Sequence, residues 1–354
     1  MDAKIKPVRL ADVAKAAGVS HGTASNVFSR PEIVREEVRE RVRAAAGKLG
    51  YGGPDPKGRL LRAGKVNAIG VATAEPLSYF FDDPFARVVM SGISEACDRT
   101  GAGIALVSAA NEEQLAWNIR SALVDGFIVF CLEGGSRLVE LTRERGLPFV
   151  ALDFGFDDER IAAIGVDDVA GARRAARHLA GLGHRRFAIL SLEFDGGGHG
   201  PASFERASAT VYAGTRDRIA GYLGAITEAG ADPASVPIYE TQNDKATTHA
   251  GLEYFFAAET PPTAILAMSD KVALYALDWL AARGIPVPGD VSVVGFDGVP
   301  EGETSEPPLT TIAQPMAEMG RRAVEMILGF DGTIRRETLD VELIVRGSTS
   351  APRG

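Results

Sequence analysis

The chain has 354 residues, which is too long for a single ordinary hydrophobic core and indicates two or three domains. Its 45% hydrophobic and 24% charged residues are normal for a globular protein. The sequence contains no run of about 18 apolar residues, and its start, MDAKIKPVRL, has no apolar stretch like that of a secretory signal. These features exclude a membrane-spanning protein and predict a cytoplasmic one. Cys97 and Cys131 lie far apart in apolar contexts, which favours reduced core thiols over a disulfide.

Charge is distributed unevenly along the chain. Residues 1–65 carry 14 Lys and Arg against 7 Asp and Glu, a net charge of +7, whereas the rest carries 24 against 40, a net −16. A basic head on an acidic body predicts that the head alone meets a polyanion. A chance fluctuation of charge within a short segment is the alternative.

Three short helices are expected first. Apolar residues fall at helical spacing over 10–17, Gly18 suits the turn that follows, and Ser20 can cap a second helix. A third helix is expected over 35–49, with apolar residues on one face. Two helices around a glycine turn, supported by a third, predict a helix-turn-helix unit.

The start of the second helix presents small or polar groups that can enter a major groove and reach base edges and phosphates. These candidate DNA-binding residues are Ser20, His21, Gly22, Thr23, Ser25 and Asn26. An ordinary three-helix bundle explains the apolar positions equally well. It does not explain the small polar side chains or the local positive charge.

The stretch LADVAKAAGVSHGTASNVF, followed by VREEVRERVRAAAGKLGY, resembles the DNA-binding headpiece of the LacI/GalR family of bacterial transcription regulators. Asn26 stands where that family often has arginine, which implies a different base preference. Arg9 and Arg35 occupy positions where the family usually has a Thr or Ser helix cap. We expect each of these two helix starts to lack a side-chain cap, which costs about 1 kcal/mol.

Residues 52–65, GGPDPKGRLLRAGK, are rich in Gly, Pro and basic residues and predict a linker. GRLLRAG is long enough for a short helix that is stable only when something holds it. The family resemblance implies a hinge helix that folds on DNA and places Leu61 as an apolar wedge in the minor groove. Pro56 and Gly58 weaken such a helix, and packing of Leu61 on the body is the alternative.

From Val66 onward, apolar runs alternate with amphipathic helical patterns such as 85–99, 112–123 and 136–145. Strands that are buried on both faces and alternate with helices predict a doubly wound α/β structure. The runs form two series, which predict two lobes, and ligands of such folds bind beyond the carboxyl ends of the strands. The expected strands cover 67–73, 103–108, 126–130 and 148–152 in the first series and 162–167, 186–192, 263–268 and 291–296 in the second.

The resemblance continues through GVDDVAGARRAARHLAGLGHRRFAIL, PTAILAMSDKVALYALDWLAARGIPVPGDVSVVGFDG and PPLTTIAQP, which are similar to the family's effector-binding core. It implies a two-lobed core with the periplasmic-binding-protein-like (type I) fold, so the fold class expected is α/β with a helix-turn-helix headpiece. The expected domains are the headpiece at 1–51, a hinge at 52–65 and an effector-binding and dimerisation core at 66–354. Within the core, lobe 1 is expected over about 66–165 and 314–337, and lobe 2 over about 166–297 and 338–350.

Polar side chains at strand ends match effector-contacting positions of the family. Carboxylates with one arginine suit hydrogen bonding to vicinal hydroxyls, and an aromatic face suits a sugar or base ring. The candidates are Phe85, Asp153, Arg218, Ser269, Asp270 and Asp297. A turn or helix cap is the alternative for each carboxylate, Asp270 above all, and a salt bridge is the alternative for Arg218. Ala246 stands where relatives carry an aromatic lid, so the aromatic face must come from elsewhere, with Phe85 and Phe154 as candidates.

Signals of catalysis do not appear in the sequence. The glycine-rich DGGGHG at 195–200 lacks the Lys-Ser/Thr of a phosphate-binding loop and indicates a surface loop. The five histidines show no metal-ligand spacing, and no Gly-x-Ser-x-Gly nucleophile motif occurs. We therefore expect no catalytic residue, metal or cofactor.

The function expected is that of a sequence-specific DNA-binding regulator, a repressor, which binds a pseudo-palindromic operator as a homodimer. A small-molecule effector between the lobes would control it, a sugar or related polyol first and a nucleoside or purine second. A sugar-delivering solute-binding protein and a sugar-acting α/β enzyme are the alternatives. The basic head and absent signal peptide oppose the first, and the missing catalytic groups oppose the second.

Overall fold

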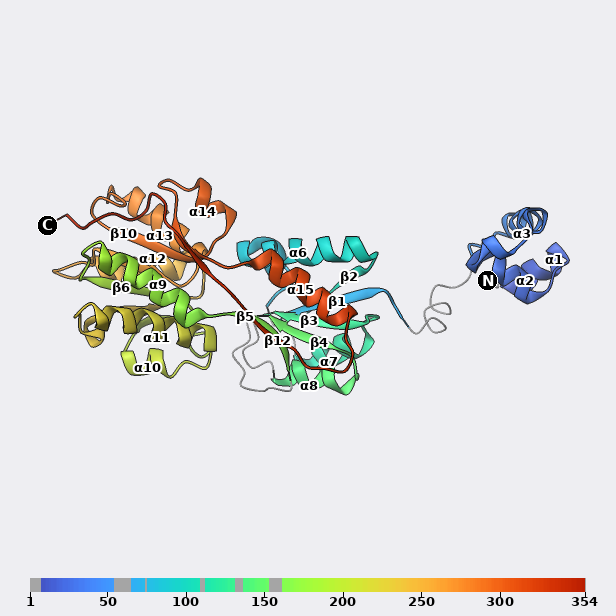
Figure 1. Cartoon of the computed structure of the whole chain (residues 1–354), viewed down its shortest axis with the longest axis horizontal. Helices are drawn as coiled ribbons and strands as arrows, with labels where there is room; N and C mark the ends of the chain where they lie inside the picture. The colour runs from blue at the N-terminus through green and yellow to red at the C-terminus, as the bar shows by residue number, and fades with distance from the viewer. Residues whose placement is uncertain are drawn as a thin grey trace, which may run out of the picture. The chain divides into compact units, whose positions relative to one another are not determined.

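The computed structural model describes residues 8–53, 65–73, 75–108, 112–130, 136–152 and 161–353 (Figure 1). The chain divides into two compact units: Met1–Val66, which contains the headpiece, and Asn67–Gly354, which we call the core. Leu61, Cys131, Asp153 and Phe154 lie outside the described residues, so the predictions made for them stay predictions.

The headpiece contains α1 (Leu10–Ala17), α2 (His21–Ser29), the short 3-10 helix η1 (Pro31–Ile33) and α3 (Glu36–Leu49). The three expected α-helices are therefore confirmed. Gly18 ends α1 in the left-handed conformation, with a φ of 64°. The helices enclose a small core in which Val and Ala side chains allow close packing: Val13, Ala14, Ala17, Ala24, Val27, Val42 and Ala46.

The helix starts of the headpiece differ in how they are capped. The Ser20 hydroxyl accepts a hydrogen bond from the Thr23 amide at 3.0 Å, as a cap of α2 should. Neither Arg9 nor Arg35 provides a side-chain cap, as predicted. At α1 the Asp12 carboxylate instead accepts a hydrogen bond from the Arg9 amide at 2.9 Å. A side chain in the first turn of the helix thus satisfies the backbone amide of the residue that precedes the helix.

Lobe 1 of the core is built on a six-stranded sheet in the order β12-β5-β4-β3-β1-β2, in which every pairing is parallel. Helices α6 (Pro84–Thr100) and α15 (Met316–Leu328) cover one face, preceded by the short α5 (Tyr79–Asp82), and α7 (Glu112–Ser121) and α8 (Ser136–Glu144) belong to the other. The strands are β1 (Ala68–Thr73), β2 (Gly103–Ser108), β3 (Gly126–Phe130), β4 (Phe149–Leu152), β5 (Ala162–Val166) and β12 (Arg336–Leu339).

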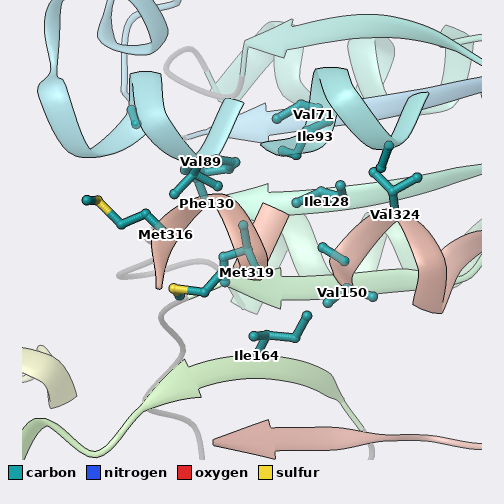
Figure 2. Close-up of a cluster of buried hydrophobic side chains, with 14 of the residues drawn as sticks. Val71, Val89, Ile93, Ile128, Phe130, Val150, Ile164, Met316, Met319 and Val324 are labelled. Atoms are coloured by element: carbon teal, nitrogen blue, oxygen red, sulfur yellow. The ribbon is translucent and has the colours of Figure 1, made fainter. Parts of the chain in front are cut away.

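The face of this sheet under α6 and α15 carries the main core of lobe 1 (Figure 2). Val89 and Ile93 of α6 and Met319 of α15 meet the strands there. The two helices approach so closely that a Cβ at Gly320 would lie 2.3 Å from the Val89 carbonyl oxygen, so glycine is required there.

Lobe 2 has a seven-stranded sheet in the order β13-β11-β10-β9-β6-β8-β7. Helices α9 (Asp168–Gly181) and α11 (Ala213–Glu228) pack on one face, and α12 (Lys245–Phe256) and α13 (Asp270–Ala282) pack on the other. The strands are β6 (Phe187–Ser191), β7 (Gly200–Ala202), β8 (Ile238–Glu240), β9 (Ala264–Ala267), β10 (Ser292–Asp297), β11 (Thr310–Ala313) and β13 (Glu342–Ile344); the remaining short helices are α10 (Phe204–Ser208), η2 (Pro233–Ser235) and α14 (Pro300–Thr304).

The doubly wound architecture in two lobes is confirmed, with three differences in detail. The edge strands β7 and β13 pair antiparallel with their neighbours. Residues 338–339 belong to β12 in the sheet of lobe 1, and 310–313 add β11 to lobe 2. The chain therefore passes between the lobes after β5, after β11 and after β12. Among the described residues, no helix has the length and apolar character needed to cross a membrane.

Candidate nucleic-acid interface and effector cavity

The candidate DNA-binding residues of the headpiece gather at the start of α2. His21 and Gly22 are exposed, whereas Thr23, Ser25 and Asn26 are half-buried at the edge of the helix. Ala24 and Val27 face the core of the headpiece and fix which side of α2 is presented outward. The structure thus places all five residues, with the cap Ser20, on one short stretch.

The first turn of α2 is suited to a negatively charged ligand. It contains no acidic residue. The first amide groups of a helix have no carbonyl partner within the helix, and they carry its partial positive charge. The hydroxyls of Ser20 and Thr23 lie 2.8 Å apart and hold each other in place. Exposed amides and ordered hydroxyls at a helix start are the groups that bind phosphate oxygens.

Gly22 is not required by the packing of the headpiece. A Cβ built there meets nothing closer than the Ser20 hydroxyl oxygen, at 3.8 Å. An exposed glycine in a helix is less stable than alanine by roughly 0.5–1 kcal/mol. Neither packing nor helix stability therefore accounts for glycine at this position, whereas close approach of a ligand to the helix would.

The core holds a cavity of about 80 Å³ between its two lobes. Of the predicted effector-binding residues, Phe85, Arg218, Ser269 and Asp297 line it, and Asp270 does not. Among the described residues, the lining comprises Tyr79, Asp83, Pro84 and Phe85 from lobe 1 and Leu192, Arg218, Asn243, Ser269, Lys271, Asp297 and Val299 from lobe 2.

Arg218 is buried in α11 and is held on several sides. Its Nε donates to Asp168 Oδ1 at 2.7 Å, and Nη1 donates to the Met268 carbonyl at 2.5 Å. Its guanidinium carbon lies 3.8 Å from the centroid of the Phe296 ring, and Nη1 lies 4.0 Å from Asp297 Oδ1. The guanidinium is therefore fixed in place at the cavity wall, and it forms a salt bridge at the same time.

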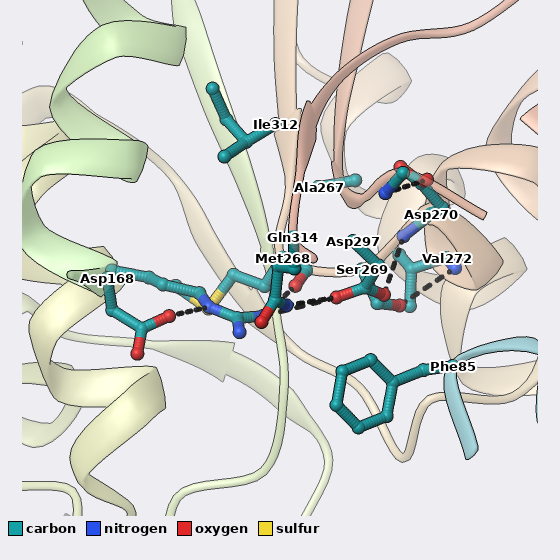
Figure 3. Close-up of polar contacts among 12 residues, drawn as sticks. Phe85, Asp168, Ala267, Met268, Ser269, Asp270, Val272, Asp297, Ile312 and Gln314 are labelled. Carbon is teal, nitrogen blue, oxygen red and sulfur yellow. Dashed lines mark hydrogen bonds and ion pairs between the residues drawn. The ribbon is translucent and has the colours of Figure 1, made fainter. Parts of the chain in front are cut away.

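Asp297 ends β10 with a φ of 123°, followed by Gly298 with a φ of 80°. Gln314 Nε2 donates to its Oδ1 at 2.9 Å, and the Asp270 amide donates to its Oδ2 at 3.3 Å (Figure 3). Burial raises the pKa of the Asp297 carboxyl well above its usual range, and the charge of Arg218 opposes that shift.

Asp270 uses its carboxylate inside lobe 2. Its Oδ2 accepts the amides of Gly298 and Val299 at 2.7 and 2.8 Å, and its Oδ1 accepts the Thr311 hydroxyl at 2.5 Å. Burial raises the pKa of Asp270 to about 6, against these hydrogen bonds. Asp270 therefore holds the turn that carries Asp297, and its own carboxylate does not reach the cavity.

Three polar cavity residues were not predicted from the sequence: Asp83, Asn243 and Lys271. Asp83 precedes Pro84 at the start of α6, and an Asp before a Pro is a signal of a helix start. Asn243 follows β8, which spans three residues and gives little signal of its own. Lys271 lies beside Asp270 in the first turn of α13, where a solvated lysine would be the ordinary expectation.

Comparisons with known proteins agree with this architecture. Residues 9–53 match the model of bacterial regulatory proteins of the lacI family, and residues 176–349 match that of the periplasmic binding protein-like domain. The HTH-type transcriptional regulator Rv3575c of Mycobacterium tuberculosis is 39% identical over 351 residues, which cover 97% of each chain.

Two solved structures extend the comparison. The lac repressor dimer bound to operator and the anti-inducer ONPF has a TM-score of 0.76 at 27% identity, over 98% of this chain and all of that one. A complex of the transcriptional regulator CelR with cellobiose has a TM-score of 0.69 at 27% identity, over 96% of this chain and 99% of that one.

The fold and these relatives define a class of protein in which a helix-turn-helix domain binds DNA and a two-lobed core binds a small molecule. This chain belongs to the LacI family of bacterial regulatory proteins and is a transcriptional regulator. The family membership expected from the headpiece and core motifs is thereby confirmed, and members of this family regulate transcription rather than catalyse reactions.

Proposed function

We propose that this regulator acts as a repressor in the cytoplasm, binding a pseudo-palindromic operator as a homodimer through the start of α2. One recognition helix contacts few bases, whereas two helices related by a two-fold axis read adjacent major grooves. The lac repressor structure named above is a dimer on its operator, which supports this arrangement. The proposal includes Leu61 as an apolar wedge in the minor groove. Leu61 lies outside the described residues, so its role rests on the family resemblance alone.

The roles along α2 follow from its geometry. The amides of His21 and Gly22 and the hydroxyls of Ser20 and Thr23 would hold phosphates, which fixes the position of the helix. Ser25 and Asn26 would reach base edges, and an asparagine pairs well with adenine. The observation that carries the proposal is that the first turn of α2, with His21 and Gly22 exposed, has no acidic residue and belongs to a basic unit.

The effector proposed is a sugar or related polyol that binds in the cavity between the lobes. Arg218 and Asp297 offer a donor and an acceptor for hydroxyls, and the Phe85 ring lies across from Asp297 (Figure 3). The CelR relative is bound to cellobiose, which supports a sugar. A nucleoside or purine is the second choice, because the Phe85 face also suits a base.

Binding must change the arrangement of the lobes. The cavity of about 80 Å³ is far smaller than typical ligand sites, which start at roughly 300 Å³. The lobes therefore have to separate to admit a sugar and settle at a new angle around it. A difference of about 1–3 kcal/mol in ligand affinity between the two arrangements would give useful control of DNA binding.

The role of α2 is tested by replacing Gly22 with alanine. We expect Gly22→Ala to stabilise the headpiece by up to about 0.5–1 kcal/mol, because alanine favours a helix and meets no neighbour. The same variant should bind the operator at least about tenfold more weakly, because the added methyl group separates α2 from the DNA. Thermal unfolding and operator titration of the full chain give the two values.

Gly47→Ala is the matched control. Gly47 is exposed in α3, and a Cβ there meets nothing within 4 Å. This variant should also gain stability while its operator affinity stays unchanged. Equal operator affinity for Gly22→Ala and wild type would remove the start of α2 from the DNA interface.

A further inference from the structure

One carboxylate of lobe 1 receives two donors from lobe 2. Asp83 is 4% exposed, and its Oδ1 accepts the amides of Phe85 and Ala86 at 3.0 and 3.2 Å, which caps α6. Its Oδ2 accepts hydrogen bonds from Asn243 Nδ2 and Lys271 Nζ, each at 3.3 Å. We call Asp83, Asn243 and Lys271 the clasp.

The two donors from lobe 2 are positioned by the structure of lobe 2 itself. Asn243 has a φ of 51°, and its Oδ1 accepts the Ser269 hydroxyl at 2.7 Å. The Ser269 oxygen in turn accepts the Val272 amide at 3.1 Å and caps α13. Lys271 belongs to the first turn of that helix, and its side chain is 25% exposed. The clasp is thus part of the cavity wall on both sides.

The positive charges at the cavity are already balanced. Lys271 Nζ lies 3.3 Å from Asp83 Oδ2, and Arg218 Nε lies 2.7 Å from Asp168 Oδ1. Asp297 adds a further carboxyl group beside Arg218. A ligand carrying a phosphate or carboxylate would meet the Asp83 carboxylate at short range, where charges of the same sign repel strongly and water screens them poorly.

We propose that Asp83, paired with Lys271, determines the effector's specificity by excluding anions, so that the effector is an uncharged polyhydroxylated molecule. This inference rests on the proposed function of the cavity. A hydroxyl can donate to Asp83 and a neighbouring hydroxyl can accept from Lys271, so each clasp residue exchanges one hydrogen bond for another. A fully ionised phosphate accepts from Lys271 but has no proton to give Asp83, whose Oδ2 then keeps only Asn243 as a donor and faces a second negative charge.

The test separates charge from shape. Asp83→Asn keeps a good helix cap for α6 and removes the negative charge, which leaves Lys271 unpaired. The full chain is titrated calorimetrically with a panel of neutral monosaccharides and cyclic polyols and with their monophosphate esters. For wild type we expect a neutral compound to bind at least about 30-fold more tightly than its ester. In Asp83→Asn this ratio should fall by about tenfold or more.

Two further variants make the result specific. Asp232→Asn is the matched control, because Asp232 is an exposed carboxylate that caps η2 through the Ala234 amide at 3.0 Å; its ratio should equal that of wild type. Lys271→Met removes the cation and should widen the ratio, because an ester then loses its partner. This second variant tests the proposal even if Asp83→Asn folds poorly.

The proposal is overturned if a phosphate ester binds wild type as tightly as its neutral parent, or if Asp83→Asn leaves the ratio unchanged. Failure of every neutral compound to bind also overturns it. Operator binding is measured on the same samples. If salt-sensitive operator binding persists, only the ligand inference has failed; if it is absent, the proposed function has failed as well.

Discussion

Asp297 adopts a φ of 123°, a region that non-glycine residues enter at a cost of about 1–3 kcal/mol. Gln314 holds it there twice: its side chain donates to Asp297 Oδ1, and its amide donates to the Asp297 carbonyl at 2.8 Å. Gln314 is also the first residue after β11, where the chain passes to lobe 1. A ligand that bonds to Asp297 therefore acts directly on a connection between the lobes.

The raised pKa of Asp297 predicts how stability depends on pH. The folded protein keeps this proton at a pH where the unfolded chain, with a pKa of about 3.9, has lost it. The stabilising effect is complete below that value and is lost as the pH rises through the folded-state pKa. Asn cannot ionise and tolerates a positive φ, so Asp297→Asn removes this dependence.

We therefore expect the melting temperature of wild type, relative to Asp297→Asn, to fall as the pH is raised from about 5 to about 8. Thermal unfolding of the full chain across this range gives the difference. Asp290→Asn is the control, because Asp290 is an exposed partner of Arg353. A melting temperature of wild type that rises relative to that of Asp297→Asn over this pH range would show that burial does not dominate at Asp297.

The residues of the cavity also show what sequence reasoning can reach. Phe85, Ser269 and Asp297 follow from the rule that ligands meet the carboxyl ends of parallel strands, together with the family resemblance. Asp83 and Lys271 do not follow, because their relation depends on how one lobe is placed against the other. A charged residue beside a helix start is usually solvated. The sequence alone does not distinguish such a residue from one that is paired with a charge on the other lobe.

At the scale of elements, α6 and α15 come from distant parts of the chain and meet at two glycines. A Cβ at Gly92 would lie 1.9 Å from the Ala317 carbonyl oxygen, and a Cβ at Gly320 would lie 2.3 Å from that of Val89. Both obstacles are backbone atoms, which cannot move aside as a side chain can. This contact attaches the segment after the second passage between the lobes to lobe 1.

We expect Gly320→Ala to destabilise the core by about 1–3 kcal/mol, because the helices must separate to admit the methyl group. Denaturant unfolding of the full chain measures this as a lower midpoint. Gly181→Ala is the control, since Gly181 ends α9 and a Cβ there meets nothing within 4 Å. If both variants unfold at the same midpoint, the close contact of α6 with α15 is not what the structure describes.

Element prediction succeeded where the strands are continuous apolar runs, most of which are buried on both faces. The eight expected strands are continuous apolar runs, and each has a counterpart in the two sheets. The strands that escaped prediction, β7, β8 and β11 to β13, have three or four residues each. The edge strand β12, with the sequence RETL, has mostly exposed or half-buried side chains and no apolar run. Its strand conformation therefore depends on the sheet with which it pairs.

At the scale of the whole molecule, charge and structural division coincide. The first compact unit ends at Val66, and residues 1–65 carry a net +7 while the rest of the chain carries −16. Each unit has hydrophobic clusters of its own. The basic unit is therefore suited to DNA, and the acidic unit should repel DNA while it holds the effector.

The most direct test of this division is the retention of two proteins on duplex operator DNA across a salt gradient: the full chain, and residues 66–354 alone. For the full chain we expect the logarithm of the binding constant to fall linearly with the logarithm of salt concentration, with a slope of about −0.9 for each phosphate contacted. The 66–354 fragment should show no salt-sensitive retention. Retention of that fragment with the slope of the full chain would contradict the assignment of DNA binding to the headpiece.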